Sequence, residues 1–368
     1  MVRGISEPLC ASYTCAYLAR VGHTMDPNAK DYLYQLVDFM FKTYNASYVK
    51  GHPSVSKEKY MQLYDPTVDW LIQCLAYQAD RNMFRDVWAM YQNNPKHAIF
   101  LKGIIRYFPA EIISVAVNVI LGAIKTDFAG KFDDQLILVK ELGLTLLRCP
   151  PKKPALKLEL INFGWETMGK TENADRYMDC SIVLIEFSIK SLNQGSVQVF
   201  IKEIFKRFQD FALSMSNDES LFLKLEFLLV KVMLTSNDFS ELIGFENLLG
   251  MLNFFPSQMK QKLCEKMLTF FCEQNSKLDD GFLVYSILQV AKTLHDKIDF
   301  MSQQSEIDRV SKIICRIIRR IDHGKDLDKT LNDYTNARGM FVNLDEVTET
   351  LITSTLQLAS RCHALCKG

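Results

Sequence analysis

The spacing of apolar residues constrains this chain more than any other feature of its sequence. Leu344, Val347 and Leu351 recur at steps of three and four residues, which is the spacing of one helical face. The same spacing dominates most of the chain, and no convincing run of alternating apolar and polar residues indicates a strand. The sequence therefore predicts an all-α fold.

The length of the chain favours a repeating arrangement of these helices. A chain of 368 residues is too long for one compact helical core. Helix pairs recur about every 40 to 45 residues, which is the period of HEAT and armadillo arrays. We predict a HEAT/armadillo-like α-solenoid of antiparallel helix pairs, continuous as a single domain over residues 1–368.

Local signals give the expected boundaries within this array. A capping residue followed by proline marks helix starts at Asp26-Pro27, Asp65-Pro66 and Asn94-Pro95. Residues 46–64 are rich in Ser, Lys, Gly and Pro, and we expect them to form an exposed loop.

Charge and cysteine usage exclude several classes of protein. Lysine plus arginine number 43 and aspartate plus glutamate also number 43, so we expect no nucleic-acid partner. The 10 cysteines form no CxxC pair and no disulfide-scaffold spacing, and the N-terminus lacks a signal-peptide pattern. A cytoplasmic, reducing compartment is the expectation.

One stretch matches the phosphate-binding pattern of nucleotide enzymes. GWETMGKT, residues 164–171, places two glycines before Lys170 and Thr171. A helix fits the stretch better, because Ile161, Trp165 and Met168 follow the three- and four-residue spacing of an apolar helical face. Gly164 would then lie inside that helix. We keep a nucleotide-binding protein as the unlikely alternative.

Histidine and cysteine residues do not combine into a convincing catalytic or metal site. His295 and Asp296 are adjacent, so on a helix their side chains point away from each other. Cys362 and Cys366 lie one helical turn apart, but no second pair at usable spacing completes a structural zinc site. We therefore expect no enzymatic activity, no cofactor and no metal.

A basic helix is the best surface patch in the sequence. The apolar stripe of residues 307–321 leaves four basic residues available for an acidic partner or acidic lipid headgroups, or simply for solvent. They are Lys312, Arg316, Arg319 and Arg320.

Five stretches resemble one family in the same order along the chain. RGISEPLCASYTCAYLARVG at residues 3–22 is similar to a segment in the large solenoid subunits of retromer and retriever, and closer to the retriever type. DPTVDWLIQCLAY at 65–77, ILQVAKTLHDKID at 287–299, LNDYTNARGMFVNLDEV at 331–347 and TLQLASRCHALCKG at 355–368 resemble later helices of that family. The matching positions are Arg3, Gly4, Pro8, Leu9, Asp69, Trp70, Cys74, Lys292, His295, Asp296, Phe341, Asn343 and Leu344.

The resemblance implies a function that the residue patterns alone do not. It covers only a middle portion of a longer family chain and implies a non-enzymatic scaffold in an endosomal retriever-type complex, which recycles membrane proteins to the cell surface. The implied partners are an arrestin-like subunit, a phosphoesterase-fold subunit, a COMM-domain and coiled-coil complex, and a sorting-nexin cargo adaptor. The implied location is cytoplasmic, with peripheral attachment to endosomes through these partners. A retromer-type subunit in endosome-to-Golgi retrieval is the alternative.

Overall fold

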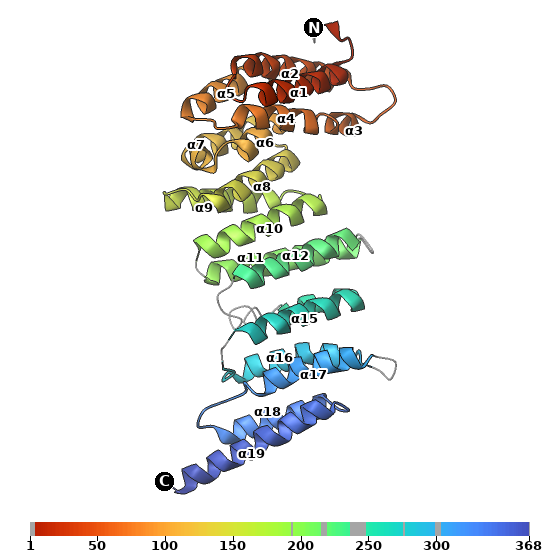
Figure 1. Ribbon diagram of the computed structural model, residues 1–368, viewed down its shortest axis with the longest axis vertical. Coiled ribbons are helices and arrows are strands. Elements are labelled where there is room, and N and C mark those ends of the chain that lie inside the picture. The colour runs from red at the N-terminus through yellow and green to blue at the C-terminus, as the bar shows by residue number, and fades with distance from the viewer. Residues whose placement is uncertain are drawn as a thin grey trace. The chain divides into compact units, whose positions relative to one another are not determined.

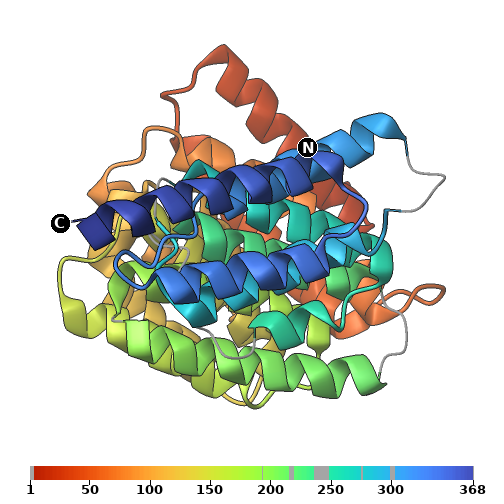
Figure 2. The same cartoon turned by 90° about the horizontal axis from the view of Figure 1, so that it is seen from below.

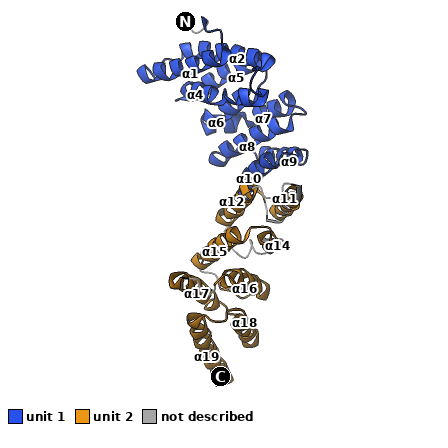
Figure 3. Ribbon diagram, turned by 90° about the vertical axis from the view of Figure 1, so that its right-hand side faces the viewer, with its two compact units in different colours: residues 1–191 blue, residues 192–368 orange. Residues whose placement is uncertain are grey.

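The computed structural model divides the chain into two compact units, Met1–Ser191 and Leu192–Gly368 (Figure 3). It describes residues 4–192, 194–214, 219–235, 248–274, 277–298 and 303–367. Within these ranges the regular elements are helices, accompanied only by two isolated β-bridges. The predicted all-α solenoid class is confirmed. Whether the two units join as one continuous array stays a prediction.

The first unit consists of helices in two rows (Figures 1 and 3). In one row, α1, α4, α6, α8 and α10 contact each other consecutively, and in the other α7 contacts α9. Their bounds, with the helices between them, are α1 Pro8–Met25, α2 Asp31–Lys50, α3 Lys57–Gln62, α4 Asp65–Ala76, α5 Arg81–Asn93, α6 Ala98–Tyr107, α7 Ala110–Asp127, α8 Phe132–Arg148, α9 Pro154–Met168 and α10 Ala174–Ser191.

Large apolar side chains fill the space between the helices of this unit. The ring of Phe100 on α6 stacks on Phe41 of α2 with centroids 3.8 Å apart, and both rings are almost completely buried. Burial of one such side chain contributes about 1.5 to 3 kcal/mol. Each helix is thus stabilised mainly by its neighbours in the stack.

The second unit repeats the two-row arrangement. One row contains α12, α15, α17 and α19 in consecutive contact, and α16 contacts α18 in the other. Figure 2 shows α18 and α19, at the C-terminal end of the chain, running side by side. The bounds are α11 Gln194–Ser214, α12 Glu219–Thr235, α14 Leu248–Leu252, α15 Ser257–Glu273, α16 Gly281–His295, α17 Gln304–Ile318, α18 Leu327–Met340 and α19 Asp345–Lys367.

The structure confirms one of the three expected helix starts and corrects two. α4 begins at Asp65 with Pro66 in its first turn. Asp26-Pro27 instead lies in the turn between α1 and α2, and α6 begins only at Ala98, beyond Pro95. The fixed φ of proline suits a turn as well as a first helical turn, so the dipeptide alone does not distinguish them.

The expectation of an exposed loop at residues 46–64 is wrong for much of that segment. α2 continues to Lys50 because Ser47 is buried and hydrogen-bonds the hydroxyl of Tyr64. α3 then begins after Ser56, whose hydroxyl accepts a hydrogen bond from the amide of Lys59. The connection is confined to residues 51–56, because side-chain burial and a helix cap override the polar composition.

Candidate functional site

The stretch that resembles a phosphate loop is helical for most of its length. Residues 164–168 belong to α9, and Gly164 is buried there against α10. A Cβ atom at Gly164 would lie 2.5 Å from Cδ1 of Leu184, so glycine permits a close helix contact. Gly169 ends the helix with φ at −62°, in the right-handed helical region rather than in the left-handed conformation common at helix ends.

The polar residues of the same stretch have partners within the protein. The ammonium group of Lys170 pairs with Glu166 one turn earlier, at 2.6 Å. The hydroxyl of Thr171 donates a hydrogen bond to Asp133 at 2.8 Å. These contacts, together with the helical backbone of residues 164–168, do not form a phosphate-binding loop.

Family-matching positions in the first unit lie on α1 and α4. Pro8 is the first residue of α1, followed by Leu9, while Gly4 is exposed ahead of the helix and Arg3 lies outside the described residues. Further along, Asp69 on α4 accepts a hydrogen bond from Arg106, 3.3 Å away. These positions support local structure.

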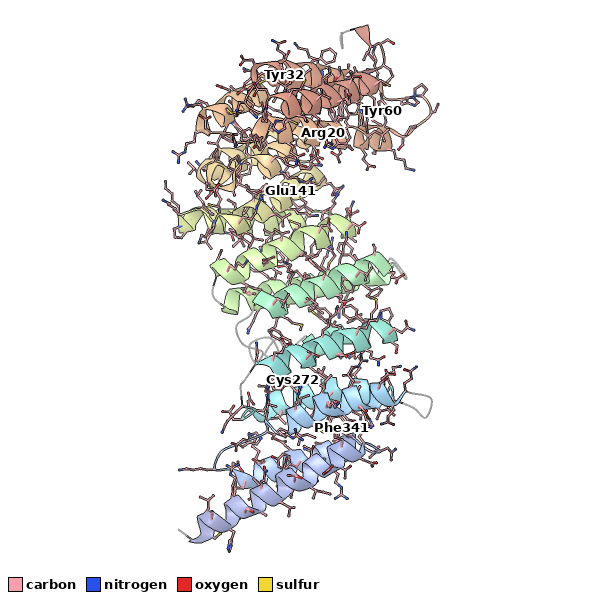
Figure 4. All side chains as sticks on the ribbon, viewed as in Figure 1. Arg20, Tyr32, Tyr60, Glu141, Cys272 and Phe341 are labelled. Atoms are coloured by element: carbon pink, nitrogen blue, oxygen red, sulfur yellow. The ribbon has the colours of Figure 1, made fainter. Side chains whose placement is uncertain are left out.

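Trp70 lies on the same helix as Asp69 but near different neighbours. Its ring lies 6.4 Å from that of Tyr13, and the guanidinium of Arg20 lies 5.2 Å from its centroid. Figure 4 labels Arg20 on α1. The buried Cys74 lies on α4 as well. Trp70 therefore links α4 to α1 through aromatic and cation–π contacts.

The structure brings two matching segments of the second unit together. His295, at the end of α16, donates a hydrogen bond from Nε2 to the carbonyl of Val342 at 2.8 Å, and its ring lies 5.8 Å from that of Phe341. Nδ1 of His295 lies 3.3 Å from a carboxylate oxygen of Asp296, so the expectation that these adjacent side chains point away from each other is wrong. Figure 4 marks Phe341 at the end of α18. His295 thus ties α16 to the connection between α18 and α19.

The other matching residues belong to the same connections. Lys292 lies on α16, and its carbonyl accepts the amide of Asp296, which closes the helix. Asn343 adopts a positive φ of 64°, a conformation that asparagine tolerates better than most residues. Leu344 is buried. These positions support the chain turn between helices.

The basic helix predicted from the sequence is α17 with the residues that follow it. Lys312 and Arg316 are exposed, and Arg319 donates a hydrogen bond to Thr350 at 3.4 Å. Arg320 points inward instead, where its two terminal nitrogens each donate to a carbonyl of α15, at Phe271 and Cys272, over 2.7 Å. Lys312 and Arg316 are therefore available at the surface, whereas Arg320 caps the end of α15.

The thiols and the apolar helices indicate neither a metal site nor a membrane span. Cys362 and Cys366 are exposed on α19, and no group of three metal-ligating side chains occurs among the described residues. None of the helices that the structure describes is long and apolar enough to cross a bilayer.

A charged groove in the first unit is a further candidate site. It has a volume of about 540 Å³ and runs from α3 across the N-terminal parts of α4, α6 and α8 to α10. Seven basic and five acidic side chains line it, so its wall is highly charged and basic side chains are in excess. We call it the unit 1 groove.

Three cross-helix ion pairs order part of this wall. Lys102 on α6 pairs with Asp65 on α4 at 3.0 Å, and Lys140 on α8 pairs with Asp179 on α10 at 2.7 Å. Arg106 binds both carboxylate oxygens of Glu141, at 3.0 and 2.5 Å. The carboxylate of Glu141 is only 8% exposed, and a two-pronged guanidinium contact compensates such burial well.

Sequence reasoning missed this groove, although one signal pointed to it. α8 begins after Lys131 and α6 after His97, and neither residue forms a side-chain cap. Lysine at a helix start is unfavourable because it meets the positive end of the helix dipole. A basic residue in that position therefore needs another reason to be there.

The fold and these sites define a class of protein. Stacked helix pairs whose polar residues mostly pair with neighbouring helices are typical of a helical-repeat scaffold. The chain belongs to the VPS35L family: residues 79–368 match the model described as "VPS35L C-terminal domain", and residues 1–65 match that described as "VPS35L".

Curated relatives agree with this assignment over the full chain. It is 29% identical over 380 residues to a human protein named "VPS35 endosomal protein-sorting factor-like" and 28% identical over 375 residues to a Dictyostelium discoideum protein of corresponding name. A Drosophila melanogaster relative is 24% identical over 376 residues. Each match covers 100% of this chain but only 37 to 39% of the relative's length.

Proposed function

We propose that this chain is a non-enzymatic scaffold in endosomal protein sorting, and that it acts in a retriever-type assembly. The observation that carries the proposal is the match of nearly the whole chain to the VPS35L family models. The names of the curated relatives supply the endosomal role. The stacked helices support a scaffold because such an array holds separate partners at fixed spacing.

The proposed partners are an arrestin-like subunit, a phosphoesterase-fold subunit, a COMM-domain and coiled-coil complex, and a sorting-nexin adaptor. Attachment to endosomes from the cytoplasm would occur through these partners. Affinity at such interfaces depends on a few well-packed anchor side chains more than on total buried area.

The test is affinity purification of the 368-residue chain from cultured cells, followed by mass spectrometry. We expect recovery of the phosphoesterase-fold subunit and the COMM-domain assembly. The Ile317→Asp variant places a charge at a fully buried position and serves as the control, since it should lose partners that require the folded second unit.

Two results would contradict the retriever proposal. Recovery of retromer-type sorting nexins instead would favour the retromer alternative. Recovery of neither set by a chain that remains helical would overturn the scaffold role of this portion. A non-hydrolysable nucleotide should leave the melting temperature unchanged both in the natural chain and in Lys170→Ala, since Lys170 pairs with Glu166.

A further inference from the structure

Several basic side chains that line the unit 1 groove take no part in the ion pairs of its wall. Among the described residues, Lys57, Lys131 and Arg176 line the groove and have no carboxylate within ion-pair distance. A fourth, Lys96, donates instead to the carbonyls of Tyr91, Gln92 and Asn94. The groove therefore carries cationic groups that its own carboxylates do not neutralise.

Two acidic residues of the wall also lack an ion-pair partner among the described residues, but they do not cancel this excess. Glu58 is exposed at the α3 end of the groove, one residue from Lys57. Burial raises the pKa of Asp134, while the nearby charges of Lys131 and Arg176 lower it. The basic side chains without an ion-pair partner outnumber these two carboxylates, so the groove keeps an excess of positive charge.

The backbone of the groove wall adds hydrogen-bond donors. α4, α6 and α8 begin directly after Tyr64, His97 and Lys131, none of which forms a side-chain cap. The first amides of each helix have no partner within the helix and carry partial positive charge. Residues near these helix starts line the groove, so the wall favours an anion there as well.

His97 provides an independent observation at the same place. Its Nε2 atom is buried and has no hydrogen-bond partner, while its ring packs against Tyr44 at 4.7 Å and Tyr48 at 5.0 Å. A buried polar atom without a partner is costly, and such atoms are uncommon in folded proteins. His97 is itself one of the residues that line the groove.

The distribution of these groups decides between a compact and an extended ligand. Lys131 and Arg176 both act on the carboxylate of Asp134, so they lie near each other on the α8 and α10 side of the groove. Lys57 belongs to α3, and α4, α6 and α8 stack in sequence before α10. Apolar side chains of Met61, Ile99 and others lie between them. A single phosphate near Lys131 and Arg176 would not reach Lys57, whereas an extended chain passes all three cations.

We propose that the unit 1 groove binds an extended acidic peptide segment of a partner protein. Carboxylates of that segment would meet Lys57, Lys131 and Arg176, and aliphatic side chains would contact the apolar positions between them. This inference is independent of the proposed sorting role, because it rests only on the geometry and charge of the groove.

The probe is a fluorescein-labelled peptide of about twelve residues in which glutamate and valine alternate, which extended would span roughly 40 Å. Its fluorescence anisotropy is titrated with the 368-residue chain. We expect saturable binding that weakens as salt is raised. A matched peptide with glutamine in place of every glutamate should bind at least about tenfold more weakly, because it lacks the charge.

Variants of the chain then locate the site. The double variant Lys131→Glu, Arg176→Glu should lower affinity at least about tenfold, a loss of about 1.4 kcal/mol. The control Lys312→Glu, Arg316→Glu makes the same change in net charge on exposed residues of α17 and should leave affinity unchanged. If charge reversal impairs folding, judged by circular dichroism, Lys131→Gln with Arg176→Gln replaces it.

Three outcomes would overturn the proposal. One is absence of acidic-peptide binding at chain concentrations up to about 1 mM, beyond which affinity is too weak for recognition. Another is an equal loss of affinity in the α17 control, which would indicate attraction by net charge alone. The third is displacement of the peptide by vesicles of phosphatidylserine, which would identify the groove as a membrane-facing surface.

Discussion

At the scale of single residues, Gly164 permits the close approach of α9 to α10. A Cβ atom there would lie 2.5 Å from Cδ1 of Leu184, whose side chain is fully buried, and 3.2 Å from Val139. We expect Gly164→Ala to lower the free energy of unfolding by about 1 to 2 kcal/mol, because overpacking outweighs the gain in helix propensity. Urea denaturation followed by circular dichroism measures the change.

Gly122 on α7 is the matched control for this substitution. A Cβ atom at Gly122 would meet nothing within 4 Å. Gly122→Ala should therefore raise the free energy of unfolding by about 0.5 to 1 kcal/mol through helix propensity alone. Equal effects of the two substitutions would contradict the account of the α9–α10 contact.

The imidazole of His97 makes stability sensitive to mild acid. Burial, with a smaller effect from Lys131, lowers the pKa of His97 from 6.5 to about 4. The unfolded chain therefore binds a proton below pH 6.5 that the folded chain binds only near pH 4, and the folded state loses stability across that interval.

We expect His97→Phe to remove this part of the pH dependence. The melting temperature of the natural chain should fall more than that of the variant as pH is lowered from 6.5 to 4, because the phenyl ring takes up no proton. Thermal denaturation of both chains across this interval measures the difference. Parallel curves would show that another group titrates there.

At the scale of whole elements, Arg320 holds the end of α15. The last carbonyls of a helix lack partners within it. Arg320 donates to that of Cys272 and adds a second donor to that of Phe271, which also accepts the amide of Gln274. Arg320→Ala should lower the free energy of unfolding by about 2 kcal/mol, because these acceptors lose a charged donor. Arg320→Lys should recover only part of the loss, since a single ammonium group does not reproduce the two-pronged contact.

The control for this element is Arg316→Ala, one turn away on α17. Arg316 is exposed, so its removal should change the free energy of unfolding by no more than about 0.5 kcal/mol. Urea denaturation of each variant measures the change in the free energy of unfolding of the second unit. A loss at Arg316 equal to that at Arg320 would show that general charge, rather than the helix cap, provides the stabilisation.

The elements also show what the sequence could and could not predict. The apolar stripe on either side of Gly164 identified α9 as a helix, because periodicity is local information. The bond between Arg106 and Glu141 joins residues 35 positions apart, and only the stacking register of α6 and α8 brings them together. The groove depends on several such registers, so no local pattern could define it.

The inward direction of Arg320 was equally hidden from the sequence. On a helical wheel it lies outside the apolar stripe of α17, like Lys312 and Arg316. Arg320 lies just beyond the C-terminal end of α17, however, and there its side chain reaches the carbonyls of α15. Contacts beyond the last turn of a helix do not follow helical periodicity.

At the scale of the molecule, each helix contacts mainly its near neighbours in the sequence. In such an array, stability is approximately the sum of individual repeats and their interfaces. A local defect should therefore raise local opening without opening the whole chain, because distant helices share no contacts with it.

Hydrogen–deuterium exchange measured by mass spectrometry can test this locality with the two destabilising substitutions. Gly164→Ala should increase exchange in α8, α9 and α10, and Arg320→Ala should increase it in α15, α17 and their neighbours. The double variant should show both changes with little coupling, because the sites lie in different units. Increased exchange in α1 and α2 on substitution of Arg320 would contradict local stability, and would require the two units to unfold together.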